Sequence, residues 1–288
     1  GLQVEVLAAK RGAAACPSAL AARLAEDETG EIKGVIVTHN ETSTGVTNDV
    51  RVLAKAKGRH PALFIVDAVS ALGAIPMRMD EWGIDVVVTG SQKALMIPPG
   101  LAFLALNDRA WAACEKSTLP KYYWDAKKVK KSLDKGQNPY TPPVSLLFGL
   151  QESLVMIEEE GEAAIAARHV LLGQAVRAGV GALGLALFAE PEVASSVVTA
   201  VCVPDGVDGK ALQKKMREAF GVTMAGGQQE LEGKIFRIGH LGHVAAADVL
   251  VTLAMLEMAL AEMGVAVSLG AGVAAAQQVF LAARRAEK

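Results

Sequence analysis

The sequence predicts an α/β protein with a mainly parallel sheet flanked by helices, followed by a smaller α+β domain. Short continuous apolar runs, such as 34–38 and 62–66, are typical of strands buried on both faces of a sheet. Helical segments separate these runs at the spacing of strand–helix–strand units, which favours parallel pairing. Of the 288 residues, 51% are apolar and 21% are charged, a composition that supports a large core and excludes a disordered chain.

The first part, residues 1–160, is expected to form the larger domain. Ser18 is the predicted N-cap of its first helix, and three prolines make 138–143 a stiff loop that is neither helix nor central strand. The stretch 108–134 is basic and contains aromatic residues, and it is interpreted as a solvated surface segment. The strands expected in this part are 1–6, 34–38, 62–66, 86–88 and 101–106, and the helices are 19–25, 48–57 and 144–160.

The second part, residues 161–288, is expected to form the smaller domain, because the order of elements changes after Gly161. A G-x-G-x-x-G pattern occupies 179–184, but a helix precedes it and a strand follows it. The dinucleotide fingerprint needs the reverse order, so we interpret the pattern as a helix terminus and reject NAD. The helices expected here are 162–178, 209–220, 245–263 and 273–286, and the strands are 185–188, 196–203 and 235–239.

Charge and composition exclude several classes of function. The net charge is −2, with 29 basic and 31 acidic residues, so the chain lacks the positive footprint of a nucleic-acid-binding protein. No apolar run approaches the roughly 20 residues of a membrane span. Three distant cysteines, Cys16, Cys114 and Cys202, fit buried thiols in a reducing compartment. His240 and His243 are three residues apart, but no second cluster completes a metal site, so no metal is predicted.

Polar side chains follow three successive strands of the predicted parallel sheet. The first strand leads into a polar cluster containing Thr42, the second ends at Asp67, and the third is followed by Lys93. Ligands of open α/β sheets bind outside the carboxyl ends of the strands, where these residues converge. A lysine that can form an imine, together with an acidic partner for a pyridinium nitrogen, is the pairing that pyridoxal 5′-phosphate (PLP) requires.

Four motifs carry a family resemblance that runs from end to end of the chain. They are Thr-His-Asn-Glu-Thr-Ser-Thr-Gly-Val at 38–46, Val-Asp-Ala-Val-Ser at 66–70, Thr-Gly-Ser-Gln-Lys-Ala-Leu at 89–95 and Phe-Arg-Ile-Gly-His-Leu-Gly at 236–242. The chain resembles the class V, fold type I aminotransferases. Within them it is most similar to the serine–glyoxylate aminotransferases of plants and algae, a narrower match that the stretches 45–49, 79–83 and 270–276 support.

The resemblance implies a role for each site residue. Lys93 would bind the PLP aldehyde and then transfer protons, and Asp67 would pair with the pyridinium nitrogen. Thr42 would lie near the phenolic oxygen of the ring, and Val69 would pack on a ring face. Gln92 would contact the phosphate, which Thr141 of the neighbouring subunit would also reach in a homodimer with shared active sites. Arg237 would bind the substrate carboxylate.

The activity implied is transfer of the amino group of serine or alanine to glyoxylate, as in photorespiratory metabolism. Family members carry a further N-terminal segment with a Gly-rich phosphate-binding turn, so we expect this chain to be a piece of a longer protein. Three alternatives stay open: a PLP-dependent lyase or desulfurase, an inactive fragment that folds and dimerises, and a disfavoured nicotinamide dehydrogenase. The expected location is a peroxisome or mitochondrion, although the ending Ala286-Glu287-Lys288 is not a peroxisomal signal.

Overall fold

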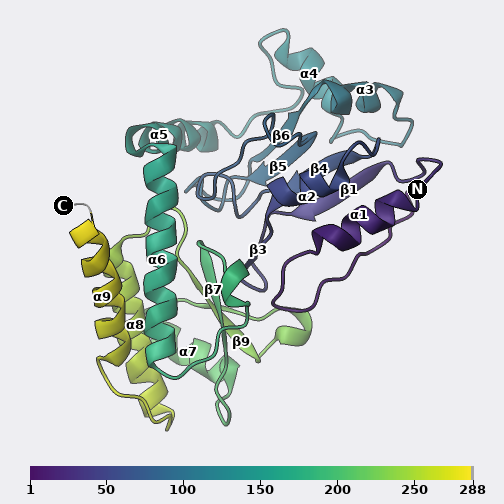
Figure 1. Ribbon diagram of the computed structural model, residues 1–288. Coiled ribbons are helices and arrows are strands. Elements are labelled where there is room, and N and C mark those ends of the chain that lie inside the picture. Colours follow the sequence, from purple (N-terminus) through teal and green to yellow (C-terminus); the bar gives the residue numbers. More distant parts are fainter. Residues whose placement is uncertain (287–288) are drawn as a thin grey trace.

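The computed structural model describes residues 1–286, in which a four-stranded and a three-stranded sheet lie in separate parts of the chain (Figure 1). In the first sheet the strands β1 (Gly34–Thr38), β4 (Leu63–Asp67) and β5 (Val86–Gly90) are parallel and lie in that order. The edge strand β6 (Ala102–Leu106) pairs with β5 in the antiparallel direction. A short hairpin, β2 (Asn40–Glu41) and β3 (Val46–Thr47), follows β1.

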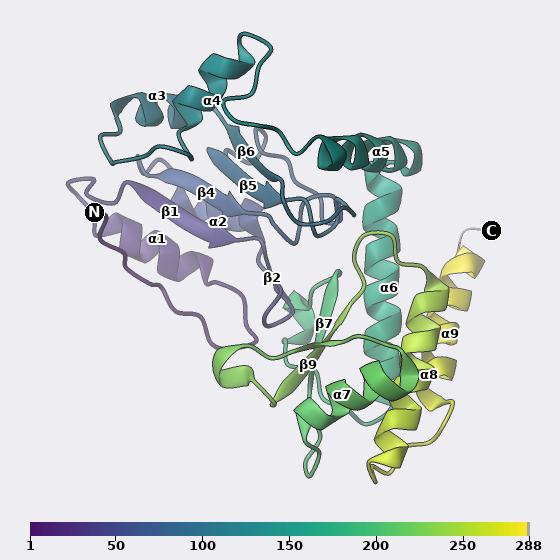
Figure 2. The ribbon, with the colours of Figure 1, turned by 180° about the vertical axis from the view of Figure 1, so that it is seen from behind.

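Two helices cover one face of the first sheet. Alternate residues along a strand point to opposite faces. On this face Phe64 and Val66 are fully buried against α1 (Pro17–Ala25) and α2 (Val50–Lys57). Figure 2 shows the sheet from the other side, with α2 behind the strands. On that other face the side chains of Ile36 and Leu104 are 75% and 51% exposed. Beyond β6 lie α3 (Asp108–Lys116) and α4 (Ala126–Leu133).

The second part packs helices against a small antiparallel sheet of β7 (Val198–Cys202), β9 (Ile235–Gly239) and β8 (Ala225–Gly226). Figures 1 and 2 place α6 (Glu162–Ala182) between β7 and β9 on one side and the helices α8 and α9 on the other. The core of this part includes the fully buried residues Leu212, Phe236, Leu253 and Leu256. The remaining elements are α7 (Gly209–Phe220), α8 (Ala246–Glu262), α9 (Ala271–Ala286) and two 3₁₀ turns, Pro191–Val193 and Gln229–Leu231.

The long helix α5 (Val144–Glu160) runs across the end of α6, and one residue, Gly161, joins the two (Figure 1). Gly161 is both the C-cap of α5 and the N-cap of α6, and its φ of +83° lies in the left-handed region that glycine adopts without a steric cost. The cores of the two parts share no residue among those described. A domain division between residues 160 and 161 stays a prediction.

Three predictions about local structure, two strands and one helix cap, are wrong. Residues 1–6 form no strand, because they pair with no neighbouring strand, and Leu2, Val4 and Val6 are 75–84% exposed. Ser18 is not an N-cap, since α1 begins one residue earlier at Pro17, a residue suited to the first helical position. The strand expected at 185–188 is reduced to an isolated bridge between Leu187 and Val201.

The predicted helix terminus at 179–184 is confirmed, with α6 ending at Ala182 and Gly184 at a φ of +74°. Among residues 1–286, no helix combines the length and apolar character that crossing a bilayer requires.

Candidate active site

The carboxyl ends of β1, β4 and β5 meet at one edge of the first sheet, as predicted. Thr38 at the end of β1 pairs with Asp67 at the end of β4, and Asp67 pairs in turn with Val88 of β5. The Asp67 side chain is fixed by its own turn, because Oδ1 accepts the N–H of Val69 at 2.9 Å. Its second oxygen, Oδ2, accepts no hydrogen bond from residues 1–286 and is free for a further donor.

Lys93 lies in the turn after β5, and Ser91 holds this turn in place. Ser91 is completely buried, and its hydroxyl donates to the carbonyl of Pro98 at 2.8 Å and accepts the N–H of Leu101 at 3.2 Å. Met96, three residues after Lys93, has a φ of +60°, which is uncommon for a residue with a side chain and concentrates at functional sites. Lys93 is a half-buried residue, and its side-chain nitrogen makes no hydrogen bond or ion pair within the described chain.

Gln92 and Thr141, the two predicted phosphate-contacting residues, are both exposed. The Gln92 amide folds back over Gly90, where Oε1 lies 2.7 Å from the position that a Cβ would take. A side chain at position 90 would therefore displace Gln92. Thr141 is part of the loop before α5, and within residues 1–286 no hydrogen bond joins it to the other predicted site residues.

Arg237 connects the second sheet to the loop that carries Thr42. From β9, its Nη1 donates to the carbonyl of Thr42 and its Nε donates to the carbonyl of Gly226, both at 2.8 Å. Partial burial lowers the pKa of Arg237, and the nearby Glu41 carboxylate opposes this shift. The guanidinium Nη2 has no acceptor among the described residues, which leaves one nitrogen for a carboxylate ligand.

Asn40 is a central residue of the site that sequence reasoning missed. It is 2% exposed, and its Oδ1 accepts the hydroxyls of Thr47 at 2.8 Å and Ser195 at 2.6 Å. Its Nδ2 donates to the Ser70 hydroxyl at 3.1 Å, and that hydroxyl donates to the Asn40 carbonyl. Asn40 therefore ties the Thr42 loop to the Asp67 turn and to the second part of the chain.

The buried histidines near the site are neutral. Burial lowers the pKa of His39 to about 4 and that of His240 to about 3. His240 contacts the Thr199 hydroxyl through Nε2 at 2.9 Å, while His243 is exposed. Three potential ligands from His, Cys, Asp and Glu do not gather anywhere in residues 1–286.

Comparison with known proteins shows the family to which the chain is similar. The profile of the class V aminotransferases matches residues 1–239. The chain is 46% identical over 282 residues to a protein named soluble hydrogenase, small subunit, of Synechococcus sp. (strain PCC 6716), covering 97% of this chain and 73% of that one. It is 40% identical over 284 residues to the serine–glyoxylate aminotransferase of Methylorubrum extorquens, covering 96% and 71%.

A solved structure shows the same fold. The pyridoxamine–pyruvate aminotransferase of Mesorhizobium loti superposes with a TM-score of 0.89 at 35% identity, over 94% of this chain and 70% of that one. The fold is therefore the fold type I arrangement of the PLP-dependent aminotransferases. With a family profile that covers most of its length and relatives above 30% identity, the chain belongs to the class V aminotransferases, a family of PLP-dependent transaminases.

Proposed function

We propose that this transaminase moves the amino group of serine or alanine to glyoxylate, which yields glycine and hydroxypyruvate or pyruvate. The observation that carries the proposal is the placement of Asp67 and Lys93 at the carboxyl ends of two paired parallel strands. The serine–glyoxylate aminotransferase among the relatives supports this choice of substrates. Serine, alanine and glyoxylate each carry one carboxylate, and one guanidinium suffices to bind it.

The residues at this edge fit PLP. The amine of Lys93, which has no partner among the described residues, can bind its aldehyde in the neutral form, and the free Oδ2 of Asp67 can accept a hydrogen bond from its ring nitrogen. Thr42, Val69 and Gln92 would complete the contacts to the ring and the phosphate. When bound, PLP supplies an electron sink for charge that develops at the substrate α-carbon.

The protein contributes orientation and proton transfer. Arg237 can bind the substrate carboxylate through Nη2, because Gly226 and Thr42 already fix its other nitrogens. The Lys93 amine would take up and return the proton of the substrate α-carbon. Donor and acceptor use the same carboxylate contact in turn, which suits a single small pocket.

The proposal includes a homodimer in which Thr141 of one subunit reaches the phosphate in the other. The exposed position of Thr141 supports this arrangement, as do exposed apolar residues on the adjoining helix α5, among them Phe148 at 68%. A photorespiratory role in a peroxisome or mitochondrion is the corresponding cellular proposal. Microscopy of the protein in its own cells tests that location.

A turnover assay with PLP, serine and glyoxylate tests the activity. We expect the protein to produce glycine. The Lys93→Ala variant should lose both this activity and the visible absorbance of the bound cofactor. Lys214→Ala, which removes an exposed lysine of α7, serves as the control and should keep both. Glycine production that survives Lys93→Ala would refute the assignment.

Two rival functions are separated by simple measurements. An inactive fragment that folds and dimerises would give no spectral change on titration with PLP. A desulfurase would release sulfide from cysteine, for which it needs a reactive thiol. Cys202 lies in β7, where burial raises its pKa, and Cys114 lies in α3, so neither occupies the turn that carries Lys93.

A further inference from the structure

A pocket lies at the edge of the first sheet opposite the one that carries Lys93, at the amino ends of β4 and β5. It has a volume of about 520 Å³ and lies between the end of α2, the turn at 80–83 and the start of α3. This volume is within the range of small-molecule sites. Four cationic side chains line the pocket, together with Trp82 and two carboxylates, and the cations are Arg51, Lys55, Lys57 and Arg109.

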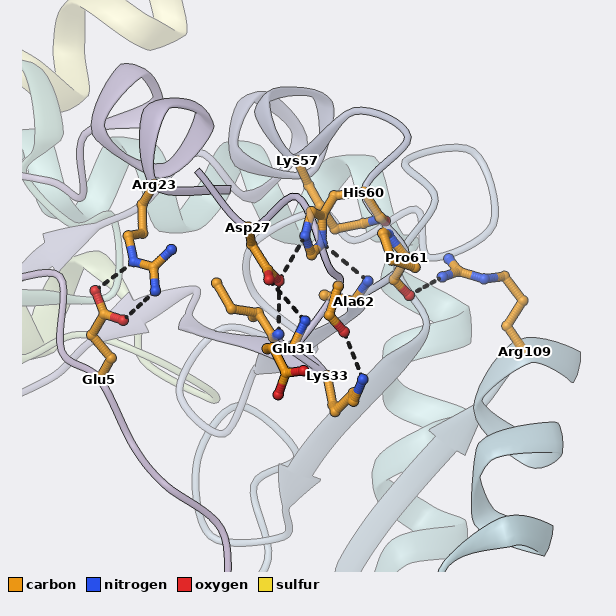
Figure 3. Close-up of polar contacts among 12 residues, drawn as sticks. Glu5, Arg23, Asp27, Glu31, Lys33, Lys57, His60, Pro61, Ala62 and Arg109 are labelled. Carbon is orange, nitrogen blue, oxygen red and sulfur yellow. Dashed lines mark hydrogen bonds and ion pairs between the residues drawn. The ribbon is translucent and has the colours of Figure 1, made fainter. Parts of the chain in front are cut away.

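Lys57 is an unusual lining residue because it is only 7% exposed. Its ammonium donates to the carbonyl of His60 at 2.7 Å, which occupies one of its three protons, and no carboxylate of residues 1–286 pairs with it (Figure 3). A buried ammonium needs an anionic or hydrogen-bonding partner. Burial lowers the pKa of Lys57, as does the positive charge of Arg109, and the Asp85 carboxylate opposes this shift.

Arg109 is held rigidly at the rim of the pocket. Its Nη1 donates to both carboxylate oxygens of Asp85, at 3.0 and 3.1 Å. Its Nη2 donates to the carbonyl of Pro61 at 2.9 Å (Figure 3). Asp85 is 1% exposed, and its carboxylate both fixes the Arg109 guanidinium and balances the positive charge of that group. The Nε–H of Arg109 has no acceptor among the described residues, so a preorganised donor remains.

Arg51 and Lys55 add positive charge that the helix itself does not require. They are four residues apart and share one face of α2, where like charges repel each other. Arg51 lies in the first turn, where the helix dipole disfavours a cation. Neither side chain forms an ion pair within residues 1–286, and Asp80 and Glu81 across the pocket pair with none of the four cations.

We propose that this pocket binds a nucleoside phosphate. The phosphate would contact Lys57, Arg51 and Lys55, since a phosphate group has several acceptor oxygens and the pocket offers several unused donors. The volume is far larger than a phosphate alone, and Trp82 supplies an aromatic surface for a planar base. Asp80 and Glu81 can accept hydrogen bonds from the sugar hydroxyls. The site is separate from the Lys93 edge and does not depend on the proposed transamination.

Calorimetric titration with AMP tests the proposal. The full chain is first saturated with PLP, so that phosphate groups do not enter the site at Lys93. We expect saturable AMP binding that weakens with salt, and binding of adenosine or inorganic phosphate that is at least about tenfold weaker. AMP that binds no more tightly than inorganic phosphate overturns the proposal, and so does the absence of saturable binding.

Two variants locate the site. Arg51→Gln with Lys55→Gln changes exposed side chains only, and we expect it to weaken AMP binding at least about tenfold. The matched control is Lys210→Gln with Lys214→Gln, which removes two exposed lysines four residues apart on α7 and should leave the affinity unchanged. Lys57→Met, checked for folding by circular dichroism, should also lose binding. The assignment to this pocket would be overturned if the double variant in α2 bound AMP as tightly as the double variant in α7.

Discussion

Asn40→Ala provides a direct test of the hydrogen-bond network behind the candidate active site. The substitution removes three side-chain hydrogen bonds, with Thr47, Ser70 and Ser195. Each net contribution is about 0.5–1.5 kcal/mol, so the free energy of unfolding should fall by about 3 kcal/mol. Ser195, at 1% exposure, loses the acceptor for its buried hydroxyl. We therefore expect the loss to exceed about 1.5 kcal/mol, the sum of the three smallest contributions.

Urea unfolding followed by circular dichroism measures this effect. Asn138→Ala is the control, because Asn138 is exposed and should change the free energy of unfolding by less than about 0.5 kcal/mol. A double-mutant cycle with Ser195→Ala should give a coupling energy of at least about 0.5 kcal/mol between Asn40 and Ser195. A loss below about 1 kcal/mol in Asn40→Ala, with no coupling, would refute the view that this network joins the two parts of the chain.

Two further predictions concern His39 and Gly45. The folded pKa of His39 is about 4 against about 6.5 when unfolded, so the unfolded chain takes up the proton first and stability falls as the pH drops from about 6.5 to about 4. The free energy of unfolding, measured by urea titration, should therefore be lower at about pH 4.5 than at about pH 7.5, and His39→Gln should reduce this difference by about 2.5 kcal/mol. An unchanged difference would contradict the prediction. Gly45→Ala should lower the melting temperature more than Gly184→Ala. Both glycines have a positive φ, but a Cβ at Gly45 would lie 3.0 Å from the Ala200 backbone nitrogen and one at Gly184 would meet no atom within 4 Å. Equal shifts in the melting temperature would count against a close approach at Gly45.

Much of the fold follows from local patterns. The apolar run at 34–38 and the long helix at 144–160 have the bounds that the sequence predicts. The direction of β6 could not be predicted in this way, because antiparallel pairing with β5 depends on how the turn at 91–101 folds back. Residues 1–6 alternate like a strand, but a strand forms only where a neighbour supplies hydrogen bonds.

The candidate site was predictable only in part. Asp67 and Lys93 follow buried strands, and the rule for carboxyl ends of strands identifies their positions. Asn40 has no comparable signal, since its partner Ser195 is 155 residues away in the sequence. The cationic pocket was missed for the same reason, because α2, the turn at 80–83 and Arg109 come together only in the folded chain.

The junction between the two parts of the chain relies on directional contacts. Besides a small apolar cluster that includes Ala94 and Val197, Asn40 and Arg237 connect the parts through hydrogen bonds. An apolar interface tolerates sliding, whereas hydrogen bonds with several fixed partners permit one relative orientation. The distance between Lys93 on one side and Arg237 on the other is thus set by bond geometry, and in the proposed function this distance would limit the length of the substrate.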